Sequence, residues 1–194
     1  MSLIAICGFQ GSGKDTLANI LVEKYGYTKV SFGGILKDAV SIIFNWDREL
    51  LEGNTTKSRE WRETVDNWWA TRLNIPNLTP RYILQHIGTD ILRNKFHPDI
   101  WVAALERKLY NKSGIVITDC RFTNEIAMVK KLDGKLIHIY KGIIPSWFGN
   151  ENEFPKEIHS SEVTWTKYKF DKTIENNGSI NDLNIKIYNY LNGK

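Results

Sequence analysis

A segment near the amino terminus, GFQGSGKDT at residues 8–16, combines glycines, a lysine and hydroxyl groups in an order that suits phosphate binding. Gly8, Gly13 and Lys14 match the pattern G-x-x-x-x-G-K, in which backbone N–H groups surround phosphate oxygens and the lysine adds a mobile charge. An apolar run precedes the segment and a helical pattern follows it, which disfavours the alternative of a glycine-rich turn without a ligand. We predict that the cofactor phosphates are bound by Gly11, Ser12, Gly13, Lys14, Asp15 and Thr16, and that Lys14 is catalytic.

Asp15 stands where this pattern usually has a serine or threonine that binds Mg²⁺. A carboxylate at this position can hold Mg²⁺ directly or through water, whereas Thr16 can reach the α-phosphate. Asp119 ends the apolar run IVITD at residues 115–119, and an aspartate at the end of a buried strand often steers Mg²⁺ through water. We therefore predict Asp15 and Asp119 as the metal-binding residues, with the inner coordination shell left open.

Arg121 follows Asp119 by two residues, and both are expected at the carboxyl edge of a sheet, where open α/β sheets bind ligands. The fixed charge of Arg121 suits an acceptor phosphate or the transferred group, so Arg121 and Asp119 join Lys14 in the predicted catalytic set. An ion pair at the end of a strand is the alternative for these two residues. Asn124 and Glu125 begin the next helix, where each can cap the helix or bind substrate.

A helix is predicted from Pro80 to about Lys95, and polar residues recur along it at intervals of four. This spacing places Arg81, Gln85, Thr89 and Arg93 on one face, with Ile83, Leu84, Ile87 and Ile91 on the other. A solvated helix face would look similar. Arginines bind phosphate through paired N–H groups and glutamine can bond two edge atoms of a base, so a substrate site is the competing interpretation.

The elements that must position these residues follow from alternating apolar runs and helical patterns. Strands are predicted at residues 3–7, 27–32, 115–119, 135–140 and 170–175, separated by helices. This alternation is typical of an α/β fold with a parallel sheet covered by helices on both faces, in a single domain over residues 1–194. Residues 45–80 are less regular, with a helix predicted over 58–73, in which a spacing of seven places Trp61 and Trp68 on one face and leaves Trp69 exposed.

Composition limits the possible functions. The chain has 194 residues, 42% of them hydrophobic, and a net charge of +4, which suits small polyanions and gives no support for binding a nucleic acid polymer. Cys7 and Cys120 each belong to an apolar region and are expected as reduced core thiols. The amino terminus runs directly into a predicted strand and no apolar stretch has membrane-spanning length, so we expect a cytoplasmic protein without a membrane partner.

Six segments in the same order resemble the phage-type deoxynucleoside monophosphate kinases. They span nearly the whole chain: GFQGSGKDT at 8–16, SFGGILKDAV at 31–40, TPRYILQHIGTDILRNKFHPDIWV at 79–102, ITDCRFTNE at 117–125, HSSEV at 159–163 and NNGSINDL at 176–183. The P-loop is shared by very many proteins, whereas the pair Leu-Gln-x-x-Gly-Thr and Asp-x-Arg-Phe-x-Asn-Glu is far more specific.

This resemblance implies a P-loop kinase fold with a five-stranded parallel core, a helical acceptor-binding region at residues 45–112 and a lid loop at 142–158. It implies ATP with Mg²⁺ as donor, and a deoxynucleoside monophosphate as acceptor, converted to the diphosphate. It also implies a donor adenine beside Asn177 and Gly178, and a possible homodimer. The implied acceptor side contains Lys37, Arg81, Gln85, Arg93 and Arg121.

The sequence departs from this family in the lid, which contains no arginine to neutralise developing charge. Lys141 stands where an arginine is usual, and Lys141, Lys156 or Arg121 must take this role. Two other functions fit less well: a P-loop kinase for a different small phosphorylated acceptor, and a nucleotide-binding module without catalysis. A base-sized slot near Gln85 and Trp101 would favour the nucleotide acceptor, and the intact set of Lys14, Asp119 and Arg121 argues against the module.

Overall fold

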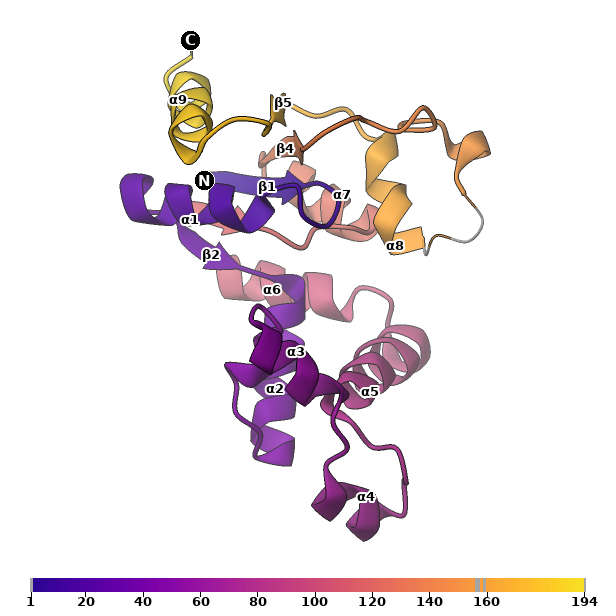
Figure 1. Ribbon diagram of the computed structural model, residues 1–194. Coiled ribbons are helices and arrows are strands. Elements are labelled where there is room, and N and C mark those ends of the chain that lie inside the picture. Colours follow the sequence, from indigo (N-terminus) through magenta and orange to yellow (C-terminus); the bar gives the residue numbers. More distant parts are fainter. Residues whose placement is uncertain (1, 156–157, 159, 194) are drawn as a thin grey trace. The chain divides into compact units, whose positions relative to one another are not determined.

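The computed structural model describes residues 2–155, 158 and 160–193. The chain forms two compact units, which Figure 1 labels by their helices and strands. We call Met1–Ser31 with Leu109–Lys194 the sheet unit, and Phe32–Lys108 the helical unit. The helical unit begins earlier in the chain than the acceptor-binding region predicted from residue 45, because the helix after the second strand belongs to it.

The sheet unit contains a five-stranded sheet in the order β2-β3-β1-β4-β5, with every neighbouring pair parallel. This confirms the predicted five-stranded parallel core. Its central strands are runs of apolar residues because both faces of the sheet are covered. The strands are β1 (Leu3–Cys7), β2 (Thr28–Val30), β3 (Ile115–Ile117), β4 (Lys135–Tyr140) and β5 (Lys172–Glu175).

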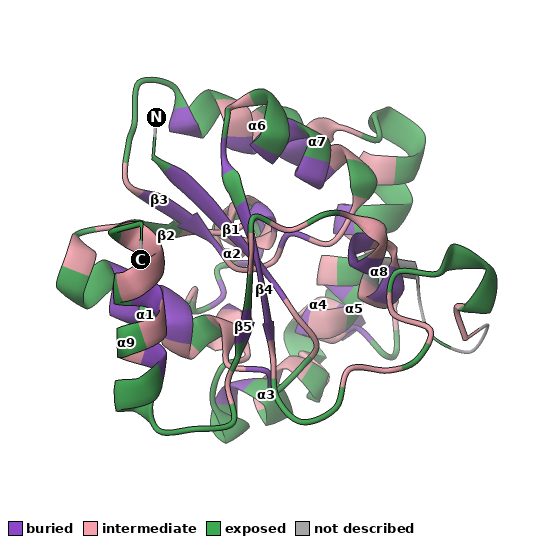
Figure 2. Ribbon diagram, turned by 90° about the horizontal axis from the view of Figure 1, so that it is seen from above, coloured by how far each residue is buried: buried purple, intermediate pink, exposed green. Residues whose placement is uncertain are grey.

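Helices cover both faces of this sheet, as predicted (Figure 2). Helices α1 (Lys14–Tyr25) and α9 (Ile180–Leu191) pack on one face, and α7 (Thr123–Lys131) packs on β1 and β4. Alternate strand residues such as Ile4 and Ile6 point to the α1 and α9 side, where they are at most 3% exposed. The sheet unit therefore has a dry core on which loops at the strand ends can be held rigidly.

Two of those loops lie on neighbouring strands. The glycine-rich segment follows β1, and Asp119 follows β3, which pairs with β1 through Ala5 and Ile117. Strand β3 ends at Ile117, two residues earlier than predicted, so Asp119 lies in the connection to α7. The Cys7 thiol donates a hydrogen bond to the Cys120 carbonyl at 3.6 Å, which joins the two loops at their base.

The helical unit is built from short helices around an aromatic core. They are α2 (Phe32–Phe44), the 3₁₀-helix η1 (Leu50–Glu52), α3 (Thr56–Glu63), α4 (Asn67–Leu73), α5 (Pro80–Gln85), the π-helix η2 (His86–Phe96) and α6 (Ile100–Leu109). Phe44 stacks on Trp46 at 4.5 Å between ring centroids, and Trp69 meets Phe44 edge-on at 4.8 Å. The Trp46 indole donates to Asp66, so its polar atom is bonded inside this core.

The predicted helix over residues 58–73 is wrong, because the chain forms two helices there. Thr64 is extended, and Asp66 caps α4 by accepting a hydrogen bond from the Trp69 N–H at 3.1 Å. The break rotates the second helix, so the seven-residue spacing of Trp61 and Trp68 does not share a face. Trp68 is 64% exposed, whereas Trp69 is half-buried and donates its indole N–H to the Phe44 carbonyl.

The predicted helix from residue 80 also changes form along its length. It is an α-helix only to Gln85 and a π-helix from His86 to Phe96. Because a π-helix bonds residue i to i+5, each turn holds more residues than an α-helical turn, so residues after Gln85 lie at other angles around the helix axis than an α-helix would give them. Ile91, predicted on the apolar face, is accordingly 38% exposed. Gly88 is buried, and the Trp101 indole donates to its carbonyl at 2.9 Å.

In the part of the chain that the structure describes, no helix combines the length and apolar character needed to cross a bilayer.

Candidate active site

The glycine-rich loop wraps around the start of α1 with the backbone that phosphate binding needs. Gly11 and Gly13 adopt φ values of +79° and +101°, in the left-handed region that favours glycine. A Cβ atom on Gly13 would collide with the Asn176 side chain, so this glycine has a steric role as well. The loop therefore depends on glycine at position 13 for both its conformation and its fit.

The Lys14 ammonium group bonds to its own loop. It donates to the carbonyl oxygens of Gly8 at 2.7 Å and Phe9 at 2.8 Å. Burial, followed by the nearby Arg121 guanidinium, lowers the pKa of Lys14 from its ordinary value. The positive charges of Lys14 and Arg121 are thus close enough to repel each other, so two of the predicted catalytic residues belong to one site.

Ser12 carries an unusual hydroxyl group. Its side chain is 4% exposed, and its Oγ has no hydrogen-bond partner among the described residues. A buried hydroxyl without a partner costs about 1–3 kcal/mol, so such a group is expected where a ligand completes its bonding. The carbonyl of Ser12 accepts a hydrogen bond from the Asn176 amide at 3.0 Å. Asn176 was not predicted as a site residue, although it adjoins the predicted pair Asn177 and Gly178.

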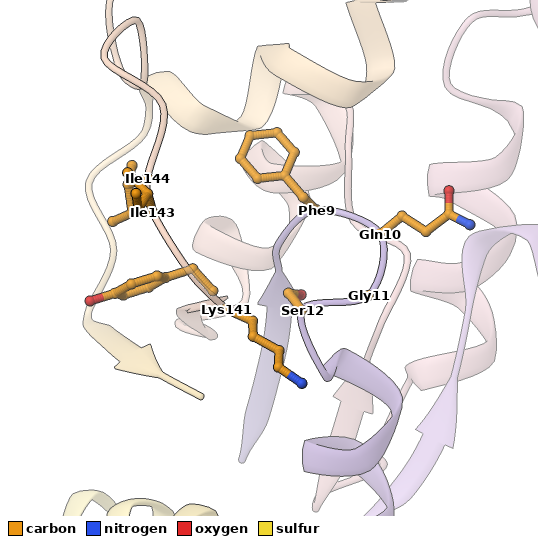
Figure 3. Close-up of a pocket in the computed structure, with 8 residues that line it drawn as sticks. Phe9, Gln10, Gly11, Ser12, Lys141, Ile143 and Ile144 are labelled. Atoms are coloured by element: carbon orange, nitrogen blue, oxygen red, sulfur yellow. The ribbon is translucent and has the colours of Figure 1, made fainter. Parts of the chain in front are cut away.

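A pocket of about 200 Å³ opens beside the loop (Figure 3). Phe9, Gln10, Gly11 and Ser12 form one side, and the end of β4 with the residues after it forms the other: Tyr140, Lys141, Ile143 and Ile144. Figure 3 shows the Lys141 side chain reaching toward the loop, whereas Gln10 points away from the isoleucines. Lys141 has no ion pair among the described residues, so its charge is available to an anion in this pocket.

Arg121 is held by carboxylates on two sides. Its guanidinium forms an ion pair with Glu162 of helix α8 (Ser160–Val163). Its backbone N–H donates to Glu125, which is only 2% exposed and also accepts from the Phe122 N–H. These bonds cap the helix, the alternative considered for Glu125, and its substrate contact stays a prediction. Asn124 likewise accepts from the Glu125 N–H at 3.0 Å.

The predicted metal ligands differ in their surroundings. The Asp15 carboxylate is 76% exposed and forms an ion pair with Lys29 at 2.6 Å. Asp119 is half-buried at the same sheet edge as the glycine-rich loop. Among the described residues no three histidine, cysteine or acidic side chains cluster as a metal cage. A site that shares Mg²⁺ with phosphates needs only one or two carboxylates, and Asp119 fits this requirement better than Asp15.

Asn177 and Gly178, predicted beside the donor adenine, lie at the end of β5. The Asn177 side chain accepts a hydrogen bond from the Gly142 N–H at 2.7 Å and donates to Glu175. Gly178 lies against Asp182, whose carboxylate caps α9 through Ser179. The segment therefore connects the start of the predicted lid to the glycine-rich loop, which Asn176 contacts.

Aromatic rings of the predicted lid loop and of the residues after it pack on the glycine-rich loop. Phe9 lies 5.7 Å from Trp147 and 5.0 Å from Trp165 between ring centroids. His138 of β4 stacks on Phe148 at 4.7 Å within the same cluster. The His138 side chain is 1% exposed and its Nε2 has no partner among the described residues, and burial lowers its pKa to about 4. Lys156, considered for the lid role, and His159, the first residue of the segment HSSEV, lie outside the described residues.

The other predicted substrate residues belong to the helical unit, where ion pairs hold several of them. Lys37 bonds to Glu52 at 2.6 Å, and Arg81 pairs with Glu63. Arg93 is half-buried. Gln85 and Thr89 are exposed. Helix α5 ends at Gln85, so the predicted stripe continues onto the π-helix with Thr89 and Arg93.

Comparison of the sequence with known proteins identifies the family to which the chain belongs. Residues 54–187 match a family model described as deoxynucleotide monophosphate kinase. A protein of Acanthamoeba polyphaga mimivirus named for the same activity is 32% identical, covering 96% of this chain and 94% of its own. The deoxynucleoside-5'-monophosphate kinase of Escherichia phage T5 is 30% identical over 97% of this chain and 95% of its own.

Solved structures give the fold. Shikimate kinase from Aquifex aeolicus aligns with a TM-score of 0.51 at 14% identity, covering 98% of this chain and 96% of that one. Dephospho-CoA kinase from Campylobacter jejuni aligns with a TM-score of 0.50 at 21% identity, covering 98% of both chains. At these identities the likeness extends to the P-loop kinase fold alone.

Proposed function

The chain belongs to the deoxynucleotide monophosphate kinase family and is a phosphotransferase that acts on deoxynucleoside monophosphates; we propose that its donor is ATP, bound with Mg²⁺ at the glycine-rich loop. The buried, unpartnered Ser12 hydroxyl inside this loop is the observation that carries the proposal. A triphosphate would supply the acceptor oxygens that this hydroxyl and the loop N–H groups lack.

The donor phosphates would draw Lys14 away from the Gly8 and Phe9 carbonyls. Because burial and Arg121 lower the pKa of Lys14, a polyphosphate would restore the favourable environment of its charged form. Lys141 is our candidate for the role of the missing lid arginine. It lines the same pocket as Ser12, and it has no ion pair among the described residues.

Phosphoryl transfer to a phosphate needs little chemistry beyond positioning. The acceptor phosphate oxygen is already a nucleophile at neutral pH, so no general base is required. Arg121 would neutralise charge on the transferred group after exchanging Glu162 for phosphate oxygens. When bound, Mg²⁺ would neutralise charge on the donor phosphates, and Asp119 would hold it directly or through water.

The acceptor would be bound by the helical unit. Lys37, Arg81 and Arg93 offer positive charge, and Gln85 offers an amide that can bond a base edge. Thr89 adds a hydroxyl that is exposed on the π-helix. Two of the cations are already paired with Glu52 and Glu63, so an acceptor phosphate must compete with carboxylates for them.

The test is acceptor-dependent ADP production. The wild type would be assayed with dTMP, dGMP, dCMP, dAMP and their ribose counterparts, beside Lys14→Ala and the control Lys24→Ala, which removes an exposed lysine from the same helix. We expect Lys14→Ala to lower turnover by roughly 100-fold or more, because it removes the mobile charge at the phosphates, and Lys24→Ala to change it little.

Two outcomes would redirect the assignment. Equal turnover of Lys14→Ala and wild type would remove the glycine-rich loop from the mechanism. ATP binding without turnover for any nucleotide in the panel would favour a different phosphorylated acceptor or a binding module.

A further inference from the structure

Arg62 of α3 is a half-buried arginine that lacks an acidic partner. Arg48, in the same unit, pairs with Asp38 and Glu52, and Arg81 pairs with Glu63, whereas the described residues place no carboxylate within ion-pair distance of Arg62. Removing a cation from water without a counter-charge is costly, so this arrangement calls for a physical explanation.

The hydrogen bonds of Arg62 use only one corner of its guanidinium. Nη1 donates to the carbonyl oxygens of Leu51 at 3.5 Å and Glu52 at 3.4 Å, at the end of the 3₁₀-helix η1. Nε is buried with no acceptor, and no bond of Nη2 is found among the described residues. Nε and Nη2 form the edge through which arginine binds an oxyanion with two parallel bonds, and here that edge has no acceptor.

The position of Arg62 is built into the local backbone. Gly53 follows η1 with φ +67°, and a Cβ atom there would collide with the Arg62 guanidinium. The side chain therefore packs flat against a glycine that leaves room for it. A guanidinium that only shielded the helix surface would not require this fit, although capping of the η1 carbonyls remains a separate structural contribution.

A second guanidinium lies nearby. Helix α3 packs against α5, and Glu63, the neighbour of Arg62 in sequence, pairs with Arg81 of α5. Burial and then the charge of Arg81 lower the pKa of Arg62. Arg59 also lowers this pKa, whereas Glu63 and Glu52 raise it. Three guanidiniums and two carboxylates therefore act together at this place, and the net positive charge suits an anion.

We propose that Arg62, together with Arg81, binds the phosphate group of the acceptor nucleotide, and that Arg62 sets the affinity for this phosphate. This inference rests on the proposed function, because it assigns a residue to the acceptor side of the same reaction. The ligand is a phosphate monoester dianion, and inorganic phosphate carries the same chemistry. Arg62 is a binding residue in this assignment, and the reacting oxygens belong to the substrates.

Binding measurements separate the phosphate from the rest of the nucleotide. Calorimetric titrations would use the best deoxynucleoside monophosphate of the panel, the matching deoxynucleoside and inorganic phosphate, with wild type, Arg62→Gln and Arg62→Lys. The control Arg72→Gln removes an exposed arginine, with the same change of charge, from α4 of the same unit. Circular dichroism melts would show whether each variant is folded.

We expect Arg62→Gln to weaken monophosphate binding by about 10- to 100-fold, because charged hydrogen bonds contribute at this level, and to leave deoxynucleoside binding within about twofold. Arg62→Lys should recover part of the loss and Arg72→Gln should lose little. In turnover assays the KM for the acceptor should rise with the KM for ATP unchanged. Weaker binding of inorganic phosphate as well would show that the site reads phosphate alone, which supports the proposal.

Two results would overturn it. A lower melting temperature of Arg62→Gln with unchanged monophosphate affinity would assign Arg62 to the capping of η1 alone. An equal loss for monophosphate and deoxynucleoside would mean that Arg62 does not read the phosphate. These binding results stand apart from the proposed function, whose own failure would appear as a wild type without acceptor-dependent turnover.

Discussion

The two units hold the residues of the proposed phosphate sites in different ways. In the sheet unit the glycine-rich loop is shaped by backbone, with Gly11 and Gly13 in left-handed conformations and Lys14 resting on loop carbonyls. In the helical unit the charges are arranged by side chains, since Lys37 and Arg48 share Glu52, and Arg81 pairs with Glu63. A site made of backbone is rigid before its ligand arrives, whereas a site made of ion pairs must exchange partners to bind.

The largest effect should come from distorting the backbone site. Gly13→Ala forces a Cβ atom into Asn176 at a φ of +101°, so we expect kcat/KM to fall by roughly 1,000-fold. Steady-state kinetics would measure the loss. Gly11→Ala is the matched control, because its φ of +79° is similar but nothing lies within 4 Å of the new methyl group. Equal losses in both variants would mean that left-handed strain, and not the contact with Asn176, governs the loop.

A second test uses pH to lower the stability of the sheet unit through His138. His138 is neutral in the folded chain because burial lowers its pKa to about 4, whereas the unfolded chain binds the proton near pH 6.5. The contribution of His138 to the free energy of unfolding should therefore be fully present above pH 6.5 and should fall as the pH drops toward 4. Below pH 4 it should level off, after a loss of up to about 3 kcal/mol.

Urea unfolding across this pH range would measure the loss, and His138→Phe, which keeps an aromatic ring in the cluster, should flatten the curve. Hydrogen exchange should report lost protection in β4 and the lid aromatics before the helical unit. A wild type and a variant with the same pH dependence would exclude His138 as its source.

A smaller effect should follow when the side-chain partner of Arg121 is neutralised. Glu162 forms an ion pair with the Arg121 guanidinium and also acts on the Lys14 ammonium, so in the proposed mechanism it competes with phosphate for Arg121. Glu162→Gln should therefore lower the KM for ATP by about three- to tenfold, a modest change because both side chains are partly exposed and screened. Glu153→Gln removes an exposed carboxylate from the same unit as a control. A higher KM would show that Glu162 positions Arg121 and does not compete for it.

The sequence predicted the elements of the sheet unit better than those of the helical unit. The loop at residues 8–16 and the strand LIAIC are consecutive residues whose conformation is decided locally, so they were predicted correctly. Asp66 is a local capping signal for the break after α3, but the contacts that hold the break and the π-helix come from Trp46, Trp69 and Trp101, which are distant in sequence from their partners. Local propensity cannot anticipate such tertiary effects.

The site residues that were missed have a shared cause. Asn176 reaches Ser12 across 164 positions of the chain, and Glu162 reaches Arg121 across 41. In the sequence Arg62 is one of many charged residues of an irregular helical region. Only the structure shows that, among the described residues, no carboxylate forms an ion pair with it. Contacts between distant segments are set by topology, and a single sequence contains no direct signal for them.

The two native thiols give the chain a practical property. Cys7 is 1% exposed and Cys120 is 2% exposed, and bonding to Cys7 together with burial holds the pKa of Cys120 well above its ordinary value. Both thiols are buried and the Cys120 thiol is also held in its protonated form, so maleimide dyes should leave the folded wild type unlabelled. Ile143, which lines the pocket beside the glycine-rich loop, is 95% exposed, and Ile143→Cys would offer a single attachment point. A fluorophore there would report nucleotide arrival without altering either native cysteine.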